Sequence, residues 1–414
     1  MPYVLGVDVG RTSGAAAVCR HDGPPAVVIA GVPAVLAVAG GRMEVGARAL
    51  GADPGQVAAD LLDQVGDDVP VLLDGVAYTA HDLLAALVAA VVDQVADGEG
   101  APPDRLAVTH PPGWGAYRRG LLRDALAEAG FPGALLLPTP VAAAEFDHFR
   151  APLAVGRTVA VALVGGRHVE FAVLSRGPAA FDLLDHAAPA EPDAGAALDD
   201  LLADLGGRLL KERLSTAAEV RVADAVVTRA AFADLARPLL TRTTDALHAY
   251  LAAHRPERAL LAGGTARVPL LAELLPGLPT PTTIPEDPAT VPARGAALAA
   301  RLRLPAPRTG SIPGFAPVAA GVLGHGGGSD PALRPVAPGR AGGAGSNPAL
   351  RPVAGRDLSP VPAREVELLE TVVSHPGFPP VTLADDVEPP PRPPVEITPL
   401  RPPPRRFGRR GRRG

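Results

Sequence analysis

Residues 3–14 read Tyr-Val-Leu-Gly-Val-Asp-Val-Gly-Arg-Thr-Ser-Gly, an apolar run that ends in small and polar residues. A second apolar run covers residues 15–19, so the pattern predicts two strands joined by a tight turn. Backbone N–H groups of such a turn can approach phosphate oxygens. Asp8, at the end of the first strand, could hold a hydrated Mg²⁺ ion, which prefers carboxylate oxygens. For this stretch alone, an ordinary hairpin is the alternative interpretation.

Two more glycine-containing turns follow apolar runs farther along the chain. Gly165-Gly166-Arg167-His168 separates strands predicted at residues 158–164 and 169–174. Residues 261–269 read Leu-Ala-Gly-Gly-Thr-Ala-Arg-Val-Pro and follow a buried strand predicted at 259–261. There the glycines allow a flat ligand to lie close to the backbone, and the N-terminus of the following helix favours negative charge. Each turn alone is a weak signal, whereas their order over two halves of the chain is more specific.

Strands that alternate with helices place the chain in the α/β class. Helices are expected where apolar residues recur at helical spacing, and Thr79 is expected to cap the first of them. The further predicted strands are 26–29, 34–38, 43–45, 106–109, 134–137 and 181–184, and the predicted helices are 81–95, 116–129, 140–146, 195–214, 229–253, 268–275 and 292–302.

The composition of the chain changes near residue 304. Ala, Val and Leu dominate before it, whereas Pro, Gly and Arg dominate after it, and residues 330–337 are nearly repeated at 347–354. We predict that residues 305–414 are disordered, with polyproline character where prolines cluster. This Pro- and Arg-rich tail could bind a protein partner through an aromatic groove. A solvated tail that only improves solubility is the alternative.

Charge and cysteine content exclude several classes of protein. The 414 residues are 47% apolar and carry a net charge of −5, so no overall positive field predicts specific nucleic-acid binding. No apolar run reaches the roughly 18 residues of a membrane span. Cys19 is the only cysteine, which precludes an intrachain disulfide. Met1 leads directly into an apolar strand without a basic segment, so we expect no signal peptide and a cytoplasmic protein.

Taken in order, these motifs resemble the nucleotide-binding domain of the heat-shock 70 (DnaK-type) chaperones, within the actin, hexokinase and chaperone superfamily. The resemblance is collinear over about residues 3–302. It implies an α/β, actin-like (ribonuclease-H-like), duplicated two-lobed ATPase fold with lobe I at residues 1–156, lobe II at 157–304 and the disordered tail at 305–414. The segments that carry it are residues 8–14, 108–112, 140–144, 163–170, 227–232, 263–269 and 295–297.

The resemblance also implies a site for ATP or ADP, with Mg²⁺ held at Asp8. Lys211, the chain's only lysine, and Ser215 fall where the family clamps adenine and ribose. A chance position on a solvated helix face is the alternative for Lys211. The implied nucleotide-binding residues are Asp8, Gly10, Arg11, Thr12, Gly165, Gly166, Arg167, Lys211, Ser215, Gly263, Gly264, Thr265 and Arg267.

Much of the family's hydrolytic chemistry is replaced in this chain. Leu163 stands where the family has an aspartate, Thr139 where it has a carboxylate, and Leu62 where it has a lysine. Phosphoryl transfer needs metal ligands, a positioned water and cationic stabilisation of the transferred phosphate. Of these groups Asp8 and Thr12 remain, so we predict nucleotide binding with weak or no hydrolysis.

Three functions remain open from the sequence. The first is a nucleotide-dependent conformational switch or chaperone-like factor, although residues 305–414 contain no segment that predicts the family's peptide-binding β-sandwich. The second is a non-enzymatic scaffold that presents the Pro- and Arg-rich tail to partners. The third is a metabolite kinase of the same superfamily, which would need an aspartate where Leu163 stands.

Overall fold

The computed structural model describes residues 2–20, 23–39, 42–189, 195–223 and 225–301. Within these ranges strands and helices alternate in a mixed α/β arrangement, as predicted, and the strands form several sheets. None of the described helices combines the length and the apolar content that a membrane span requires. The predicted disorder of residues 305–414 and their predicted binding to a partner lie outside the described residues.

The first large sheet has the strand order β10-β9-β1-β2-β3. Three strands form an antiparallel meander: β1 (Tyr3–Val9), β2 (Ser13–Arg20) and β3 (Ala26–Pro33). β9 (Arg105–His110) runs parallel to β1, and β10 (Leu135–Pro138) runs parallel to β9. The predicted strand-turn-strand at the start of the chain is therefore confirmed.

The second large sheet has the order β13-β12-β11-β16-β17. β11 (Thr158–Val164), β12 (Val169–Arg176) and β13 (Phe181–Ala187) again form an antiparallel meander. β16 (Arg258–Ala262) runs parallel to β11, and β17 (Thr282–Thr283) runs parallel to β16. The two sheets thus have the same strand order and the same strand directions.

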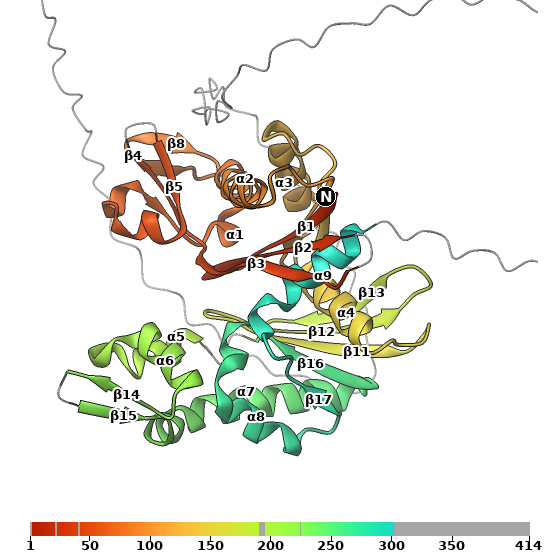
Figure 1. Cartoon of the computed structure of the whole chain (residues 1–414). Helices are drawn as coiled ribbons and strands as arrows, with labels where there is room; N and C mark the ends of the chain where they lie inside the picture. Colours follow the sequence, from red (N-terminus) through yellow and green to blue (C-terminus); the bar gives the residue numbers. More distant parts are fainter. Residues whose placement is uncertain (1, 21–22, 40–41, 190–194, 224, 302–414) are drawn as a thin grey trace, which may run out of the picture. The chain divides into compact units, whose positions relative to one another are not determined.

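Two helices lie between the sheets (Figure 1). α4 (Thr139–Arg150) follows the first sheet but contacts β11, β12 and β13, whereas α9 (Val291–Ala300) follows the second sheet but contacts β1, β2 and β9. The two helices also pack on each other at Gly295, where a Cβ atom would lie 1.7 Å from the carbonyl oxygen of Ala142. No residue with a side chain fits that approach.

The remaining helices cover the outer faces of the sheets or form smaller additions. α2 (Ala80–Glu99) is capped by Thr79, whose side chain accepts a hydrogen bond from the Asp82 backbone at 3.3 Å, so the predicted cap is confirmed. The other elements are β4 (Leu36–Ala39), β5 (Arg42–Val45), η1 (Gly46–Gly51), η2 (Pro54–Gln56), β6 (Val57–Ala58), α1 (Leu61–Gln64), β7 (Val71–Leu73), β8 (Val76–Tyr78), α3 (Ala116–Glu128), α5 (Gly195–Asp200), η3 (Ala203–Leu205), α6 (Gly207–Thr216), β14 (Glu219–Val222), β15 (Ala225–Thr228), α7 (Arg229–His254), η4 (Gly264–Arg267), α8 (Pro269–Leu274), η5 (Leu275–Gly277) and η6 (Pro288–Thr290).

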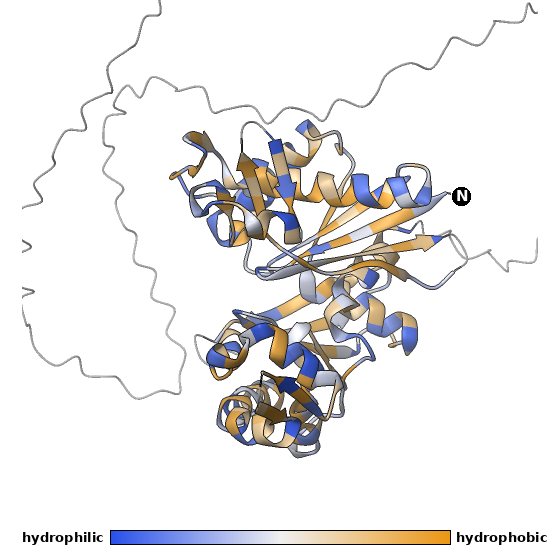
Figure 2. Cartoon of the chain, turned by 60° about the vertical axis from the view of Figure 1, so that its left-hand side comes forward, coloured by the Kyte–Doolittle hydropathy of each residue, from blue (hydrophilic) through white to orange (hydrophobic). Residues whose placement is uncertain are grey.

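Apolar side chains from both faces of each sheet form three cores. On β1, Leu5 and Val7 belong to the core beneath α2 and α3, whereas Val4 belongs to the core around α4 and α9, because successive strand residues point to opposite faces. A third core joins the second sheet to α6, α7 and α8. Figure 2 shows the corresponding hydrophobic strands inside and hydrophilic segments on the outside.

One predicted helix is wrong in its extent. Residues 195–214 were expected to form one long helix, but the structure divides them into α5, η3 and α6. The break lies at Gly206 and Gly207, whose φ angles of 113° and 49° are left-handed. Glycine adopts this conformation without a steric penalty, so the two residues end one helix and start another.

Candidate functional site

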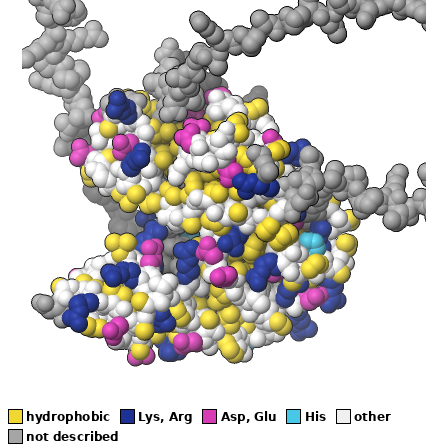
Figure 3. Space-filling model, in the orientation of Figure 1, with side chains coloured by type: hydrophobic (Ala, Val, Ile, Leu, Met, Phe, Trp, Pro, Cys, Tyr) yellow, Lys and Arg dark blue, Asp and Glu magenta, His cyan; other side chains and the backbone are white. Residues whose placement is uncertain are grey.

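The three glycine turns lie around one cavity of about 510 Å³, which is within the usual size of small-molecule sites. The face of the molecule drawn in Figure 3 shows a hollow bordered by basic and acidic side chains. All thirteen residues predicted to bind nucleotide line the cavity. They reach it from the β1–β2 turn, the β11–β12 turn, α6 and the β16–η4 turn.

The first two turns contact each other directly. The β1–β2 ladder continues to the pair Val9 and Gly14, and the Gly10 N–H donates to the Ser13 carbonyl oxygen at 3.1 Å to close the turn. A Cβ atom on Gly166 would lie 2.2 Å from the Thr12 hydroxyl oxygen. Glycine at this position therefore lets the β1–β2 turn and the β11–β12 turn meet at the cavity wall.

Asp8 lines the cavity at the end of β1. The Thr109 hydroxyl donates a hydrogen bond to its Oδ1 at 2.5 Å. Burial, reinforced by the charge of Glu170 and opposed by the Thr109 hydrogen bond, raises the pKa of the Asp8 carboxyl to about 6. A bound cation would favour the ionised form.

The carboxylate of Asp8 fits a hydrated Mg²⁺ ion better than a cation held by protein ligands alone. Among the described residues, no group of three His, Cys, Asp or Glu side chains surrounds a possible metal position. Mg²⁺ usually keeps several waters and binds through one or two carboxylates together with substrate phosphates. Asp8 could therefore hold Mg²⁺ only together with a ligand that supplies further oxygens.

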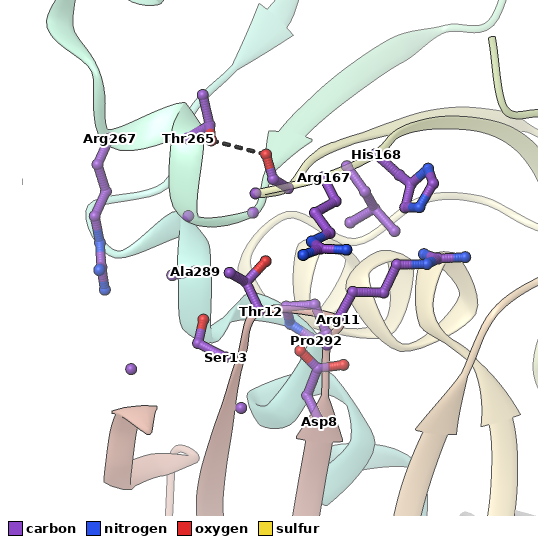
Figure 4. Close-up of a pocket in the computed structure, with 18 of the residues that line it drawn as sticks. Asp8, Arg11, Thr12, Ser13, Arg167, His168, Thr265, Arg267, Ala289 and Pro292 are labelled. Carbon is purple, nitrogen blue, oxygen red and sulfur yellow. Dashed lines mark hydrogen bonds between the residues drawn. The ribbon is translucent and has the colours of Figure 1, made fainter. Parts of the chain in front are cut away.

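Arg11 and Arg167 line this end of the cavity (Figure 4), and each forms an ion pair with a carboxylate. Arg11 donates from Nε to Asp63 at 2.8 Å and from Nη1 to Glu170 at 3.0 Å. Arg167 donates from Nη1 to Asp60 at 2.8 Å. Both guanidinium groups thus have carboxylate partners in the described structure.

The third turn is fixed by two contacts. Gly263 has a φ of 97°, and a Cβ atom there would lie 2.5 Å from the Val164 carbonyl oxygen. The Thr265 hydroxyl donates to the Gly165 carbonyl oxygen at 2.8 Å, which ties the third turn to the second (Figure 4). Gly264 differs, because a Cβ atom there would have no atom within 4 Å.

Arg267 extends along the side of the cavity opposite Arg11 (Figure 4). Its Nη2 pairs with Asp287 Oδ1 at 2.5 Å, and the Thr290 hydroxyl donates to Asp287 Oδ2 at 2.8 Å. Although burial acts in the opposite direction, these hydrogen bonds hold the pKa of Asp287 below its ordinary value. The arginine therefore has a fixed anionic partner.

Lys211 lines the cavity, but its ammonium group also joins α5 to α6. Nζ lies 2.5 Å from Asp199 Oδ1 and donates to the Gly195 carbonyl oxygen at 2.9 Å. The Ser215 hydroxyl donates to the Lys211 carbonyl oxygen at 2.9 Å, within α6. These contacts give Lys211 a structural role that the sequence did not indicate. A role in ligand binding stays a prediction.

The three residues that the resemblance sets in place of hydrolytic groups also line the cavity. Leu163, Thr139 and Leu62 all contribute to its wall. Leu163 and Leu62 are buried, and the Thr139 hydroxyl donates to the His110 carbonyl oxygen at 3.0 Å. None of the three can ionise at neutral pH or ligate a metal through a carboxylate.

The acidic partners of the predicted basic residues were not predicted from the sequence. Asp60, Asp63, Asp199 and Asp287 each pair with a predicted arginine or lysine. No local motif marks these aspartates, and three of the pairs join residues 20 or more positions apart. Spacing alone could not have found them.

A second cavity of about 910 Å³ lies beside α2, β3 and η1. Of the thirteen predicted residues, only Asp8 contributes to its lining. The predicted residues therefore gather at the first cavity. Comparison of the sequence with known protein families and with curated proteins found no match.

Proposed function

We propose that this protein binds ATP or ADP in the first cavity, as the resemblance to the heat-shock 70 nucleotide-binding domain implies. The observation that carries the proposal is the convergence of three glycine turns, more than 90 residues apart in sequence, on one cavity. If the cavity bound an unrelated ligand, there would be no reason for all the residues that the resemblance implies to line it together.

The phosphates would lie at the first two turns, where backbone N–H groups and the Thr12 hydroxyl offer donors. Asp8 would hold a hydrated Mg²⁺ ion that bridges to the phosphates. The nucleoside would lie between α6 and the third turn. Gly264 supports this position, because it presents bare backbone against which a flat base can pack.

An actin-like duplication would account for the two large sheets. Both have a three-stranded meander followed by two parallel strands, and the helix after each sheet packs on the other sheet. We propose lobe I at residues 1–156 and lobe II at 157–304, with the cavity formed by turns of both. Nucleotide binding would then change the angle between the lobes and act as a conformational switch.

Weak or absent hydrolysis is part of the proposal. Leu163, Thr139 and Leu62 line the cavity where the family has an aspartate, another carboxylate and a lysine. An apolar or neutral wall at these positions offers neither a metal ligand nor a cation for the transferred phosphate. The same replacement argues against the metabolite kinase, because Leu163 provides no catalytic base.

A thermal-shift experiment with millimolar ATP and ADP tests the proposal, since a ligand that binds the folded state raises the melting temperature. Wild-type protein should be stabilised. Gly264→Val should fold normally but lose the ligand effect, because its side chain would project into open space at the cavity.

Gly277→Val is the matched control. A Cβ atom at Gly277 also has no atom within 4 Å, but this residue does not line the cavity. It should retain the full nucleotide shift. Equal shifts in all three proteins would place any bound nucleotide elsewhere, and no shift in wild type would reject the proposal.

A further inference from the structure

A short acidic segment holds the arginines at the proposed phosphate end of the cavity. Asp63 accepts from Arg11 Nε through both carboxylate oxygens, at 2.8 and 3.1 Å. Asp60 accepts from Arg167, and Asp63 lies 3.8 Å from the Nε2 atom of His168. One segment thus contacts both the β1–β2 turn and the β11–β12 turn.

The local structure explains why two carboxylates project together. Asp60 has a φ of 56° and precedes α1, and the Asp63 N–H donates to the Asp60 carbonyl oxygen at 3.0 Å. Leu61 and Leu62, between them, are 3% and 4% exposed and belong to the first core. The buried leucines anchor the segment, and the two aspartates reach Arg11 and Arg167, which line the cavity.

These ion pairs compete with phosphate for the same donors. The guanidinium fork binds carboxylate and phosphate with the same paired geometry. The Asp60 and Asp63 side chains are 29% and 44% exposed, and ion pairs that open to water contribute little to stability. The arginines can therefore exchange the aspartates for phosphate at little cost in free energy. If an arginine bound phosphate and aspartate at once, phosphate oxygens would lie beside carboxylates.

We propose that Asp60 and Asp63 set the selectivity of the cavity for the number of phosphates. A polyphosphate takes Arg11 and Arg167 from these aspartates and releases the segment, whereas a monophosphate is too short to gain from the exchange. The inference rests on the proposed function for its nucleotide form. Its ionic part depends only on the two arginines and their carboxylate partners, which for Arg11 include Glu170 as well as Asp63.

Calorimetric titration of the full chain with AMP, ADP and ATP in metal-free buffer tests this competition. The variants are Asp60→Asn, Asp63→Asn and the double variant. Asn also tolerates the left-handed backbone at residue 60, so the fold should persist. We expect each variant to bind ATP about three- to tenfold more tightly and AMP with unchanged affinity.

Asp68→Asn is the matched control, because Asp68 is exposed and, unlike Asp60 and Asp63, has no ion pair with Arg11 or Arg167 in the described structure. It removes the same charge and should leave all three affinities unchanged. An equal gain for AMP and ATP, or the same gain in Asp68→Asn, would show a general charge effect and overturn the proposal. So would unchanged or weaker ATP binding in the double variant.

Inorganic tripolyphosphate separates this inference from the proposed function. If wild type and variants bind no nucleotide but the double variant binds tripolyphosphate more tightly, the competition stands and the nucleotide proposal fails. If nucleotide binds, but ATP and tripolyphosphate each bind wild type and variants with equal affinity, only the competition fails.

Hydrogen exchange gives a second readout. The Asp63 and Val65 amides, bonded to the carbonyl oxygens of Asp60 and Leu61, should exchange faster with ATP or tripolyphosphate bound. Unchanged protection would contradict release of the segment.

Discussion

At Asp8 the protein places a carboxyl group where burial opposes its charge. The raised pKa of about 6 has burial as its main cause, and the Thr109 hydrogen bond only partly offsets it. An ionised carboxylate without a cation is therefore costly in this position. A bound Mg²⁺ ion would remove much of that cost, so the proposed metal should bind more weakly as the pH falls below about 6.

Asp8→Asn should make stability less dependent on pH. Because the folded pKa lies above the ordinary value of 3.8, the folded state binds the proton more tightly, so stability from this group is fully present below pH 4 and is lost as the pH rises through 6. Relative to wild type, the variant should gain about 1–3 kcal/mol between roughly pH 4 and pH 7. Urea unfolding of both proteins over this range measures the difference, and a difference that stays constant with pH would contradict the raised pKa.

Some residues at the site could be predicted from the sequence, and others could not. The glycines and Thr12 could be placed because turns between apolar strands have a local signature. Asp60 and Asp63 could not, since their pairing with Arg167 and Arg11 depends on chain segments that meet only in the folded protein. Lys211 was placed at the cavity from the sequence, but its contacts with Asp199 and Gly195, which join α5 to α6, could not be predicted.

Among the elements, α4 and α9 join the two sheets most closely. Their contact depends on Gly295, and the contact of α9 with β1 depends on Gly6, where a Cβ atom would lie 2.2 Å from the Ala297 nitrogen. Both neighbours are backbone atoms, which cannot move aside as a flexible side chain can. The sequence predicted both helices but not which sheet each one covers.

Gly295→Ala should therefore destabilise the protein although alanine favours helices. We expect a loss of at least about 2 kcal/mol, because the methyl group overlaps the Ala142 carbonyl and forces the helices apart. Gly120→Ala in α3 is the control, since a Cβ atom there has no atom within 4 Å. That change should be neutral or stabilising by up to about 1 kcal/mol. Equal effects of the two changes in chemical denaturation would contradict the close packing of α4 on α9.

Elements with strong periodicity were predicted well, and elements set by tertiary contacts were not. Thr79 and Thr228 cap α2 and α7, each through its side-chain hydroxyl. The hairpins β7–β8 and β14–β15, whose strands have three or four residues, were not predicted. Two-stranded hairpins of that length depend on packing rather than on a pattern of their own.

Over the described part of the molecule, the repeated strand order is the main organising feature. Each large sheet contributes a turn between its first two strands, and both turns line the first cavity. The α/β class followed from the sequence, whereas the matching order of the two sheets became visible only from the strand pairing. The two turns approach each other at Thr12 and Gly166, and it is there that we propose the phosphates bind.

Calorimetric titration of the wild-type chain with ADP and ATP, with and without Mg²⁺, tests the central claim most directly. The proposal predicts one nucleotide per chain with a dissociation constant below about 1 mM, and stronger ATP binding when Mg²⁺ is present. Absence of binding for both nucleotides at millimolar concentration, with and without the metal, would contradict it.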